Sequence, residues 1–199
     1  MEKIKISSII GVDYGAKLAG TTAIALVEKQ KIIFFQSSKK QDADAFVKDF
    51  LDKNKVCLLG LDAPLSLPKI YRDETQGNDY FYREADKLLG AMSPMFLGGL
   101  TARAMQLAAY CRQKQIQMIE VYPAILAKKW NLEQFQYKKS LSLIHQACKA
   151  IEEKIGYQLA QKPENWHQFD AVLALATALR YYYQQAERFG NESEGIIWV

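Results

Sequence analysis

The sequence predicts a mixed α/β fold, a five-stranded sheet in the strand order 3-2-1-4-5 with helices on both faces and a helical insertion after the fourth strand. Three β-branched, apolar runs near the N-terminus are joined by short turns, which favours an antiparallel meander. A fourth apolar run follows an amphipathic helix and can therefore lie parallel to the first by a right-handed crossover. A fifth run comes after further helices, and most of the remaining chain has helical spacing.

The first half of the chain contains the meander and the crossover. Strands are predicted at residues 4–13, 21–27, 32–36 and 56–62. Apolar residues at helical spacing predict a helix over 42–54, with charges on its other face. Residues 63–79 contain two prolines and a polar stretch, and a loop of this length inside a domain is usually functional or disordered.

The second half is mainly helical. The predicted helices span residues 80–89, 101–115, 124–130, 138–155 and 166–188. A fifth strand is predicted at 116–122, where it ends at Pro123, and the apolar tail 196–199 could add a strand at the edge of the sheet. There are no internal repeats and no interdomain linker, so we expect one domain over residues 1–199.

Composition excludes several classes of protein. The chain has 199 residues, 49% of them hydrophobic, and a net charge of +4, which permits contact with nucleic acid without requiring it. No run approaches the ~18 apolar residues of a membrane helix, and the N-terminus lacks the shape of a signal peptide. Three scattered cysteines predict reduced thiols in a cytoplasmic protein, and only two histidines argue against a zinc site.

Two of the predicted strands end in glycine, an aliphatic residue and aspartate: Gly11-Val12-Asp13 and Gly60-Leu61-Asp62. A carboxylate at the end of a buried strand is costly unless its charge is compensated. If the first and fourth strands are parallel neighbours, Asp13 and Asp62 lie ~4.8 Å apart at one end of the sheet. A shared divalent cation would compensate both charges.

Two more carboxylates complete the predicted site. Glu120 lies near the end of the fifth strand, and Asp170 begins the most apolar helix. Oxygen ligands suit Mg²⁺ or Mn²⁺, and two such ions can activate water and stabilise the leaving oxygen of a phosphodiester. We predict Asp13, Asp62 and Asp170 as metal ligands and Glu120 as an assisting catalytic residue. His167, three residues before Asp170, is a surface residue or a neighbour that moves protons.

Each carboxylate also has a structural alternative. Asp13 and Asp62 could begin turns, since aspartate is a common turn residue. Glu120 could point to solvent, and Asp170 could be favoured by the helix dipole in a first helical turn.

The element order is that of a ribonuclease H-like sheet, and a longer set of motifs resembles the DUF429 family. The motifs are Gly11-Val12-Asp13, Gly60-Leu61-Asp62-Ala63-Pro64-Leu65-Ser66-Leu67-Pro68, Arg83-x-x-Asp86, Glu120-Val121-Tyr122-Pro123, Asp170-Ala171 and Glu194-Gly195-Ile196-Ile197. The resemblance spans nearly the whole chain and implies a predicted nuclease with a ribonuclease H fold. The chain departs from the family pattern at 78–86, where that pattern often has Arg, Cys-Asp and Arg.

A second resemblance covers only the N-terminus. Asp13-Tyr14-Gly15-Ala16-Lys17-x-x-Gly20 is similar to the first strand of YqgF-type Holliday-junction resolvases and to the phosphate loop of the sugar kinase and actin superfamily. The kinase likeness implies phosphate contacts from Thr21 and Thr22. Those kinases need two such domains to enclose ATP, and 199 residues cannot supply them.

Substrate contacts are predicted around the long loop, where Arg72, Arg83 and Arg103 are interleaved with aromatic residues. Arginine on phosphate and aromatic rings on bases hold single-stranded or distorted nucleic acid. The alternatives are an aromatic core stripe and an ion pair between Arg83 and Asp86 at i, i+3. Tyr181 to Tyr183 would pack against the sheet or against a second copy in a homodimer.

The predicted function is therefore a Mg²⁺- or Mn²⁺-dependent nuclease that hydrolyses phosphodiester bonds in DNA or RNA. The alternative is a non-catalytic protein of the same fold that binds a nucleotide, a phosphate compound or a protein partner. The modest net charge keeps this alternative open.

Overall fold

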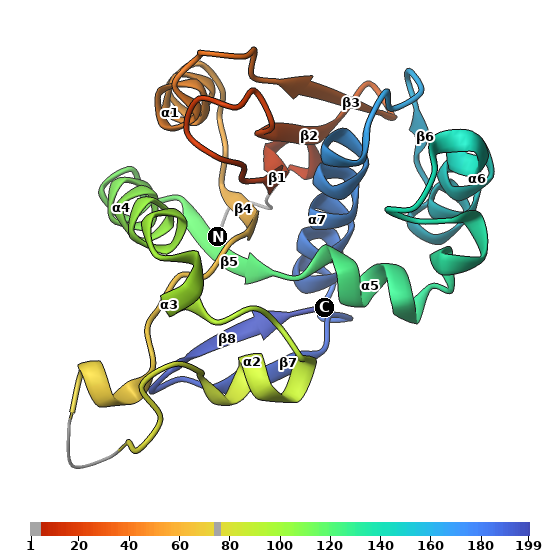
Figure 1. The fold of residues 1–199 in the computed structure, drawn as a ribbon. Helices are drawn as coiled ribbons and strands as arrows, with labels where there is room; N and C mark the ends of the chain where they lie inside the picture. Colours follow the sequence, from red (N-terminus) through yellow and green to blue (C-terminus); the bar gives the residue numbers. More distant parts are fainter. Residues whose placement is uncertain (1–4, 74–76) are drawn as a thin grey trace.

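The computed structural model describes residues 5–73 and 77–199, and its described strands all belong to one sheet (Figure 1). The strands are β1 (Ile9–Asp13), β2 (Ala23–Glu28), β3 (Lys31–Gln36), β4 (Leu58–Asp62), β5 (Gln117–Val121), β6 (Gln158–Leu159), β7 (Arg188–Asn191) and β8 (Gly195–Trp198). The helices are α1 (Ala43–Lys53), α2 (Glu84–Leu89), α3 (Pro94–Leu97), α4 (Gly99–Gln113), α5 (Pro123–Lys129), α6 (Ile144–Ile155) and α7 (Trp166–Tyr182). Short 3₁₀ turns occupy Ile6–Ser8, Lys69–Tyr71, Leu132–Phe135 and Leu141–Leu143.

The centre of the sheet has the predicted topology. The strand order is β6-β3-β2-β1-β4-β5-β8-β7, which contains the order 3-2-1-4-5. β1, β2 and β3 form an antiparallel meander, and β4 lies parallel to both β1 and β5. The ribonuclease H-like α/β arrangement is therefore confirmed, with three strands added at the edges.

β7 and β8 differ from the prediction for the C-terminal part of the chain. The helix predicted to reach residue 188 ends at Tyr182, and Arg188–Asn191 form β7 instead. Gln184 has φ 58°, which takes the chain out of the helix. The tail strand β8 pairs with β5 on one side and β7 on the other, so it is an interior strand and β7 is the edge.

Several element boundaries also differ from prediction. β1 begins at Ile9, and the predicted start at residue 4 lies outside the described residues, as do residues 74–76 of the long loop. α2 begins at Glu84 because the Asp79 carboxylate accepts from the N–H groups of Phe81 and Tyr82 and holds them in a turn. α6 begins at Ile144, six residues later than predicted, and Lys138 has a left-handed φ of 58°.

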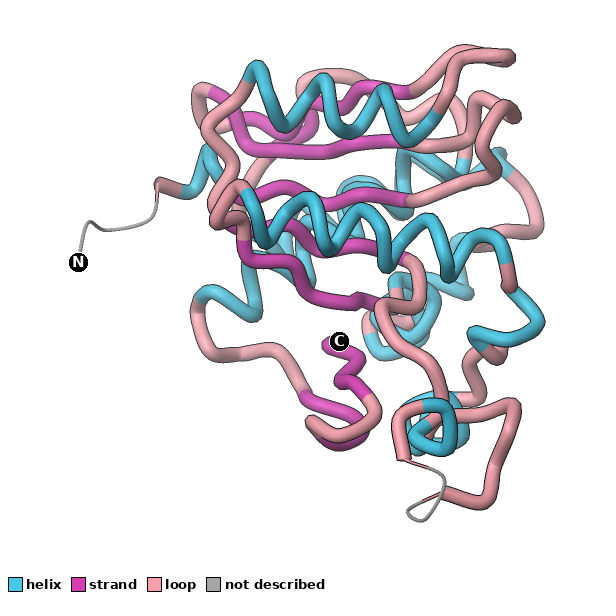
Figure 2. The backbone as a smooth tube through the Cα atoms, turned by 90° about the vertical axis from the view of Figure 1, so that its left-hand side faces the viewer, coloured by secondary structure: helices cyan, strands magenta, loops and turns pink. Residues whose placement is uncertain are grey.

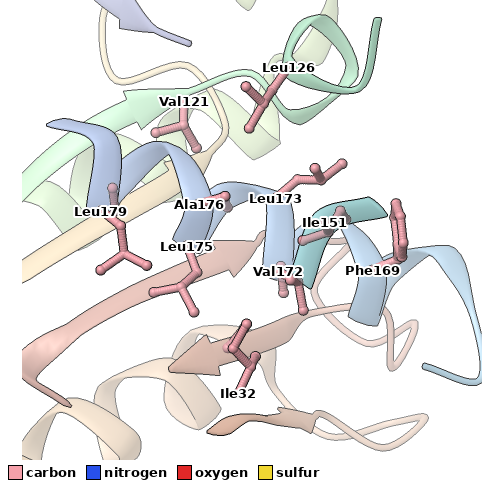
Figure 3. Close-up of a cluster of buried hydrophobic side chains, with 14 of the residues drawn as sticks. Ile32, Val121, Leu126, Ile151, Phe169, Val172, Leu173, Leu175, Ala176 and Leu179 are labelled. Carbon is pink, nitrogen blue, oxygen red and sulfur yellow. The ribbon is translucent and has the colours of Figure 1, made fainter. Parts of the chain in front are cut away.

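The two faces of the sheet have separate hydrophobic cores. Figure 2 shows α1 and α4 running across one face, where Val47, Leu51 and Leu107 pack on Ile10 and Val12 of β1. The other face is covered by α7, with α5 and α6 beyond it. Figure 3 shows Val172, Leu173 and Leu175 of α7 within that second core, together with Ile32 of β3 and Leu126 of α5.

Two paired glycines bring α7 close to the sheet. Gly11 of β1 and Gly60 of β4 are partners in the parallel register. A Cβ on Gly11 would lie 1.9 Å from the backbone nitrogen of Leu175, and one on Gly60 would lie 2.9 Å from the carbonyl oxygen of Ala174. Only glycine permits this approach of helix backbone to strand backbone.

In the described part of the chain, α7 and the other helices are too short or too polar to cross a bilayer.

Candidate metal centre

Asp13 and Asp62 lie side by side, as their strand ends predicted. They are Cα partners at the last position of the β1–β4 pairing, so both carboxylates leave the sheet at the same end. Side chains alternate between faces along a strand. Because Ile9 and Gly11 face α7, Asp13 faces it too, and the same alternation from Leu58 and Gly60 places Asp62 on that face.

Asp170 joins this pair from α7. Asn165 caps the helix by accepting from the Gln168 N–H, and both residues donate side-chain hydrogen bonds to Gln36 Oε1 of β3. Asp170 therefore lies in the second turn of a well-anchored helix, not at its start as predicted. One carboxylate oxygen from each of Asp13, Asp62 and Asp170 lies within 4.8 Å of the others.

The electrostatics of the three carboxylates favour a cation. Burial, with repulsion from Asp13 and Asp170, raises the pKa of Asp62 well above its ordinary value. Burial also raises the pKa of Asp170 to about 6, although Lys138 opposes this shift. Within the described residues no donor is hydrogen bonded to Asp62. An all-oxygen set of this kind fits Mg²⁺ or Mn²⁺, whose charge would offset the mutual repulsion.

Two residues that the sequence interpretation did not place in the site hold Asp170. Tyr137 is buried against Trp166 and Phe169 and donates its Oη hydrogen to Asp170 Oδ1 at 2.6 Å. Lys138 Nζ lies 2.7 Å from Asp170 Oδ2. Burial of its stem opposes the ammonium charge, but the carboxylates of Asp170, Asp62 and Asp13 together outweigh burial and raise the pKa of Lys138.

His167 lies beside Asp13, one helical turn before Asp170. Its Nδ1 is 2.8 Å from Asp13 Oδ2, and its side chain is 45% exposed. The hydrogen bond with Asp13 raises the pKa of the imidazole. The position corresponds to the predicted neighbour of the site and leaves the ring open to solvent.

Glu120 lies outside the carboxylate cluster. It is the register partner of Leu61, and both residues point to the face opposite that of Asp62. Its buried carboxylate accepts from Arg83 at 2.7 Å through each oxygen and from the Leu65 N–H at 2.8 Å. A metal-assisting role for Glu120 therefore has no support from this geometry, and neither does the alternative of a solvent-facing residue.

The three arginines predicted to contact substrate differ in their surroundings. The Arg83 side chain has no exposed surface and bonds to both Asp86 and Glu120, which confirms the expected ion pair with Asp86 and commits its guanidinium to two carboxylates. Arg103 is bound to Asp44 and to the Gly15 carbonyl and lies 4.7 Å from the centre of the Tyr14 ring. Arg72 is exposed and donates to the Ser193 carbonyl.

The aromatic residues divide between core and surface. Tyr181 packs edge-on against Trp198 of β8, which confirms packing against the sheet for this tyrosine. Tyr71, Tyr80 and Phe81 near the long loop stay exposed.

The fold and the site together define a ribonuclease H-like protein with a carboxylate cluster at the carboxyl ends of its central strands. Among solved structures, the chain is similar to Thermus thermophilus RuvC in complex with a Holliday junction substrate, with a TM-score of 0.46. It is also similar to a second structure of Thermus thermophilus RuvC, with a TM-score of 0.43. Each is 15% identical, over 89% of this chain and 96% of that chain. No protein-family model matches the sequence, and no curated protein matches it.

Proposed function

We propose that this protein is a divalent-metal-dependent nuclease that hydrolyses phosphodiester bonds in nucleic acid. The observation that carries the proposal is the convergence of Asp13, Asp62 and Asp170 from two adjacent strand ends and one helix. Open α/β sheets form their sites at this end of the strands. Membership of the DUF429 family, which the sequence motifs suggest, belongs to the same proposal.

The three aspartates would hold Mg²⁺ or Mn²⁺. A bound divalent ion supplies a Lewis acid for the phosphate oxygens and lowers the pKa of a bound water. The chain itself contributes the positions of the ligands. Tyr137 fixes the orientation of the Asp170 carboxylate, and the pairing of β1 with β4 fixes the spacing of Asp13 and Asp62.

His167 is the residue in this site that can exchange protons with solvent. Its Nδ1 is held by Asp13, and its exposed ring leaves Nε2 free to accept or donate a proton near neutral pH. Lys138 adds a positive charge next to Asp170, where it can also attract a phosphate group. Arg72, which is exposed and donates to the Ser193 carbonyl, stays a proposed substrate contact.

A second candidate function rests on Lys138. Its ammonium already gives Asp170 a positive partner, so part of the counter-charge is supplied without metal. This favours the alternative of a non-catalytic protein that binds a nucleotide, a phosphate compound or a protein partner.

Metal binding and cleavage separate the two functions. We expect calorimetry to show that the wild type binds Mn²⁺. Labelled single-stranded, duplex and branched DNA and RNA are then tested as substrates, and we expect cleavage of at least one of them only when metal is present. Asp13→Asn should lower Mn²⁺ affinity at least about 100-fold and abolish cleavage, because it removes a direct ligand. Asp49→Asn is the matched control, because Asp49 is exposed on α1 and the charge change is identical.

The proposal fails if the wild type binds no Mn²⁺ at millimolar concentration, or if Asp13→Asn retains metal-dependent cleavage. Circular dichroism and thermal melting of both variants check that they remain folded.

A further inference from the structure

A cavity of about 230 Å³ lies at the carboxyl ends of β1, β4 and β5, directly beside the carboxylate cluster. Asp13 and Asp62 line it. Most of its remaining lining is apolar and comes largely from the insertion after β4, the start of α4 and the end of β5. The apolar lining includes Ala91, Met92, Leu97 and Leu100, with Tyr122 from the end of β5.

The charges of the cavity exclude a phosphate from its apolar end. Arg83 also lines the cavity, but its guanidinium is already shared between Asp86 and Glu120. Four carboxylates thus line the cavity with one buried cation, and no uncommitted positive group is present among the described lining residues. An anion would be repelled there, whereas a flat uncharged group would gain contact with Met92 and Leu97.

The size of the cavity limits the ligand. Its volume is below the ~300–1,000 Å³ of pockets that hold drug-sized ligands, so it accommodates one heterocycle and not a base pair. A ligand that joins an apolar heterocycle to a phosphate would contact the apolar lining through the heterocycle, with the phosphate beside the cation that the carboxylates are proposed to hold. A nucleotide unit within a nucleic acid strand has this chemistry.

We propose that the cavity binds one unpaired nucleobase next to the phosphate presented to Asp13 and Asp62. This inference rests on the proposed nuclease function and narrows its substrate to single-stranded or distorted nucleic acid, because a base within a duplex must leave the stack to enter a pocket. Met92, which is 60% exposed, and Leu97 would contact the base.

Binding of an unpaired base in the cavity is tested directly with a fluorescent base analogue. A single-stranded oligonucleotide carrying 2-aminopurine is titrated with protein in Ca²⁺, to favour binding over cleavage, and again in EDTA. We expect a change in fluorescence with the single strand and little change with the matching duplex. An oligonucleotide with an abasic site at the same position should bind about tenfold more weakly, the loss typical of one stacked base.

Variants that fill the cavity with a larger side chain, compared with a control variant outside it, test the same proposal. Met92→Trp and Leu97→Trp should each weaken single-strand binding about tenfold and leave Mn²⁺ affinity unchanged. Leu88→Trp is the control, because Leu88 is 60% exposed on α2 and does not line the cavity. Met92 is the safer site if Leu97→Trp fails to fold.

The inference is overturned if the cavity variants and the abasic strand bind as tightly as their controls while Mn²⁺ binding and cleavage persist, a result that leaves the nuclease proposal standing. If Mn²⁺ binding and cleavage are both absent, the nuclease proposal falls. The 2-aminopurine titration in EDTA then decides on the base site alone: loss of the signal in Met92→Trp supports it, and an unchanged signal refutes it.

Discussion

Lys138 places a positive charge directly beside the carboxylate cluster. The ammonium lies 2.7 Å from Asp170 Oδ2 and is about half exposed, so it competes with an incoming metal ion without being locked in place. The left-handed backbone at Lys138 and the buried ring of Tyr137 position this segment against α7. We infer that the positive charge of Lys138 repels a divalent ion and so lowers the affinity of the cluster for that ion.

Lys138→Met should therefore raise Mn²⁺ affinity by about fivefold, because half-exposed ion pairs contribute up to ~1 kcal/mol. Calorimetry at low ionic strength measures the change. Lys139→Met makes the same change in net charge at the next, exposed residue and should leave the affinity close to wild type. A lower affinity in Lys138→Met would show instead that the lysine supports the metal site.

Some residues of the site were predictable from the sequence and others were not. Asp13 and Asp62 were predictable because strand pairing fixes their relation. Glu120 was misplaced because the face of a strand residue depends on register, and a shift of one residue reverses it. The apolar neighbours Ile119 and Val121, which face α7, were the available signal. Tyr137 and Lys138 come from an irregular segment before α6, and the helix predicted from residue 138 gave no reason to bring either residue to Asp170.

At the scale of elements, the position of α7 determines whether the site forms. Asp170 reaches the two strand aspartates because α7 packs backbone to backbone on β1 at Gly11. The glycine of each Gly-aliphatic-Asp motif thus has a role separate from that of the aspartate.

Gly11→Ala should destabilise the protein by about 3 kcal/mol, at the upper end for overpacking, because the contact is with helix backbone that cannot rotate away. Gly60→Ala has more room and should cost about 1 kcal/mol. Urea denaturation compares these variants with Gly99→Ala, where an added Cβ meets nothing within 4 Å and stability should hold or rise slightly. Equal losses at all three positions would contradict the packing account.

The central elements were predictable and the peripheral ones were not. Long apolar runs and amphipathic spacing identify β1 to β5 and α1 from local sequence alone. β6 has two residues and β7 has four, and both exist because a partner strand is already in place. Arg188–Asn191 carry no apolar run that would distinguish them from the end of a helix.

At the scale of the whole molecule, a buried network joins segments that are far apart in the chain. Arg83 links α2 to Glu120 of β5 and to the Ser66 hydroxyl after β4. Ser66 in turn donates to the Glu194 carbonyl between β7 and β8, and the Glu194 carboxylate accepts from the N–H groups of Lys69 and Glu84. The insertion, the central sheet and the C-terminal hairpin are therefore held as one unit.

Arg83→Met should lower the free energy of unfolding by about 3 to 5 kcal/mol, because it leaves Asp86 and Glu120 buried without their counter-charge. The control is Arg188→Met, whose partner Glu192 is 82% exposed and whose loss should cost less than about 1 kcal/mol. Urea denaturation of both variants measures the difference. Similar, small losses would mean that the network contributes little to stability.

The close packing of α7 on Gly11 and Gly60 also bears on ionic radius. Mg²⁺ requires oxygens at 2.0–2.1 Å in a strict octahedron, whereas Ca²⁺ accepts 2.3–2.6 Å and looser geometry. The distance between Asp170 and the strand aspartates follows the separation of helix from sheet, which the two glycines keep small. In the proposed metal site, discrimination between ions of different size would therefore depend partly on residues that never touch the ion. A methyl group placed under α7 would shift the preference toward the larger cation.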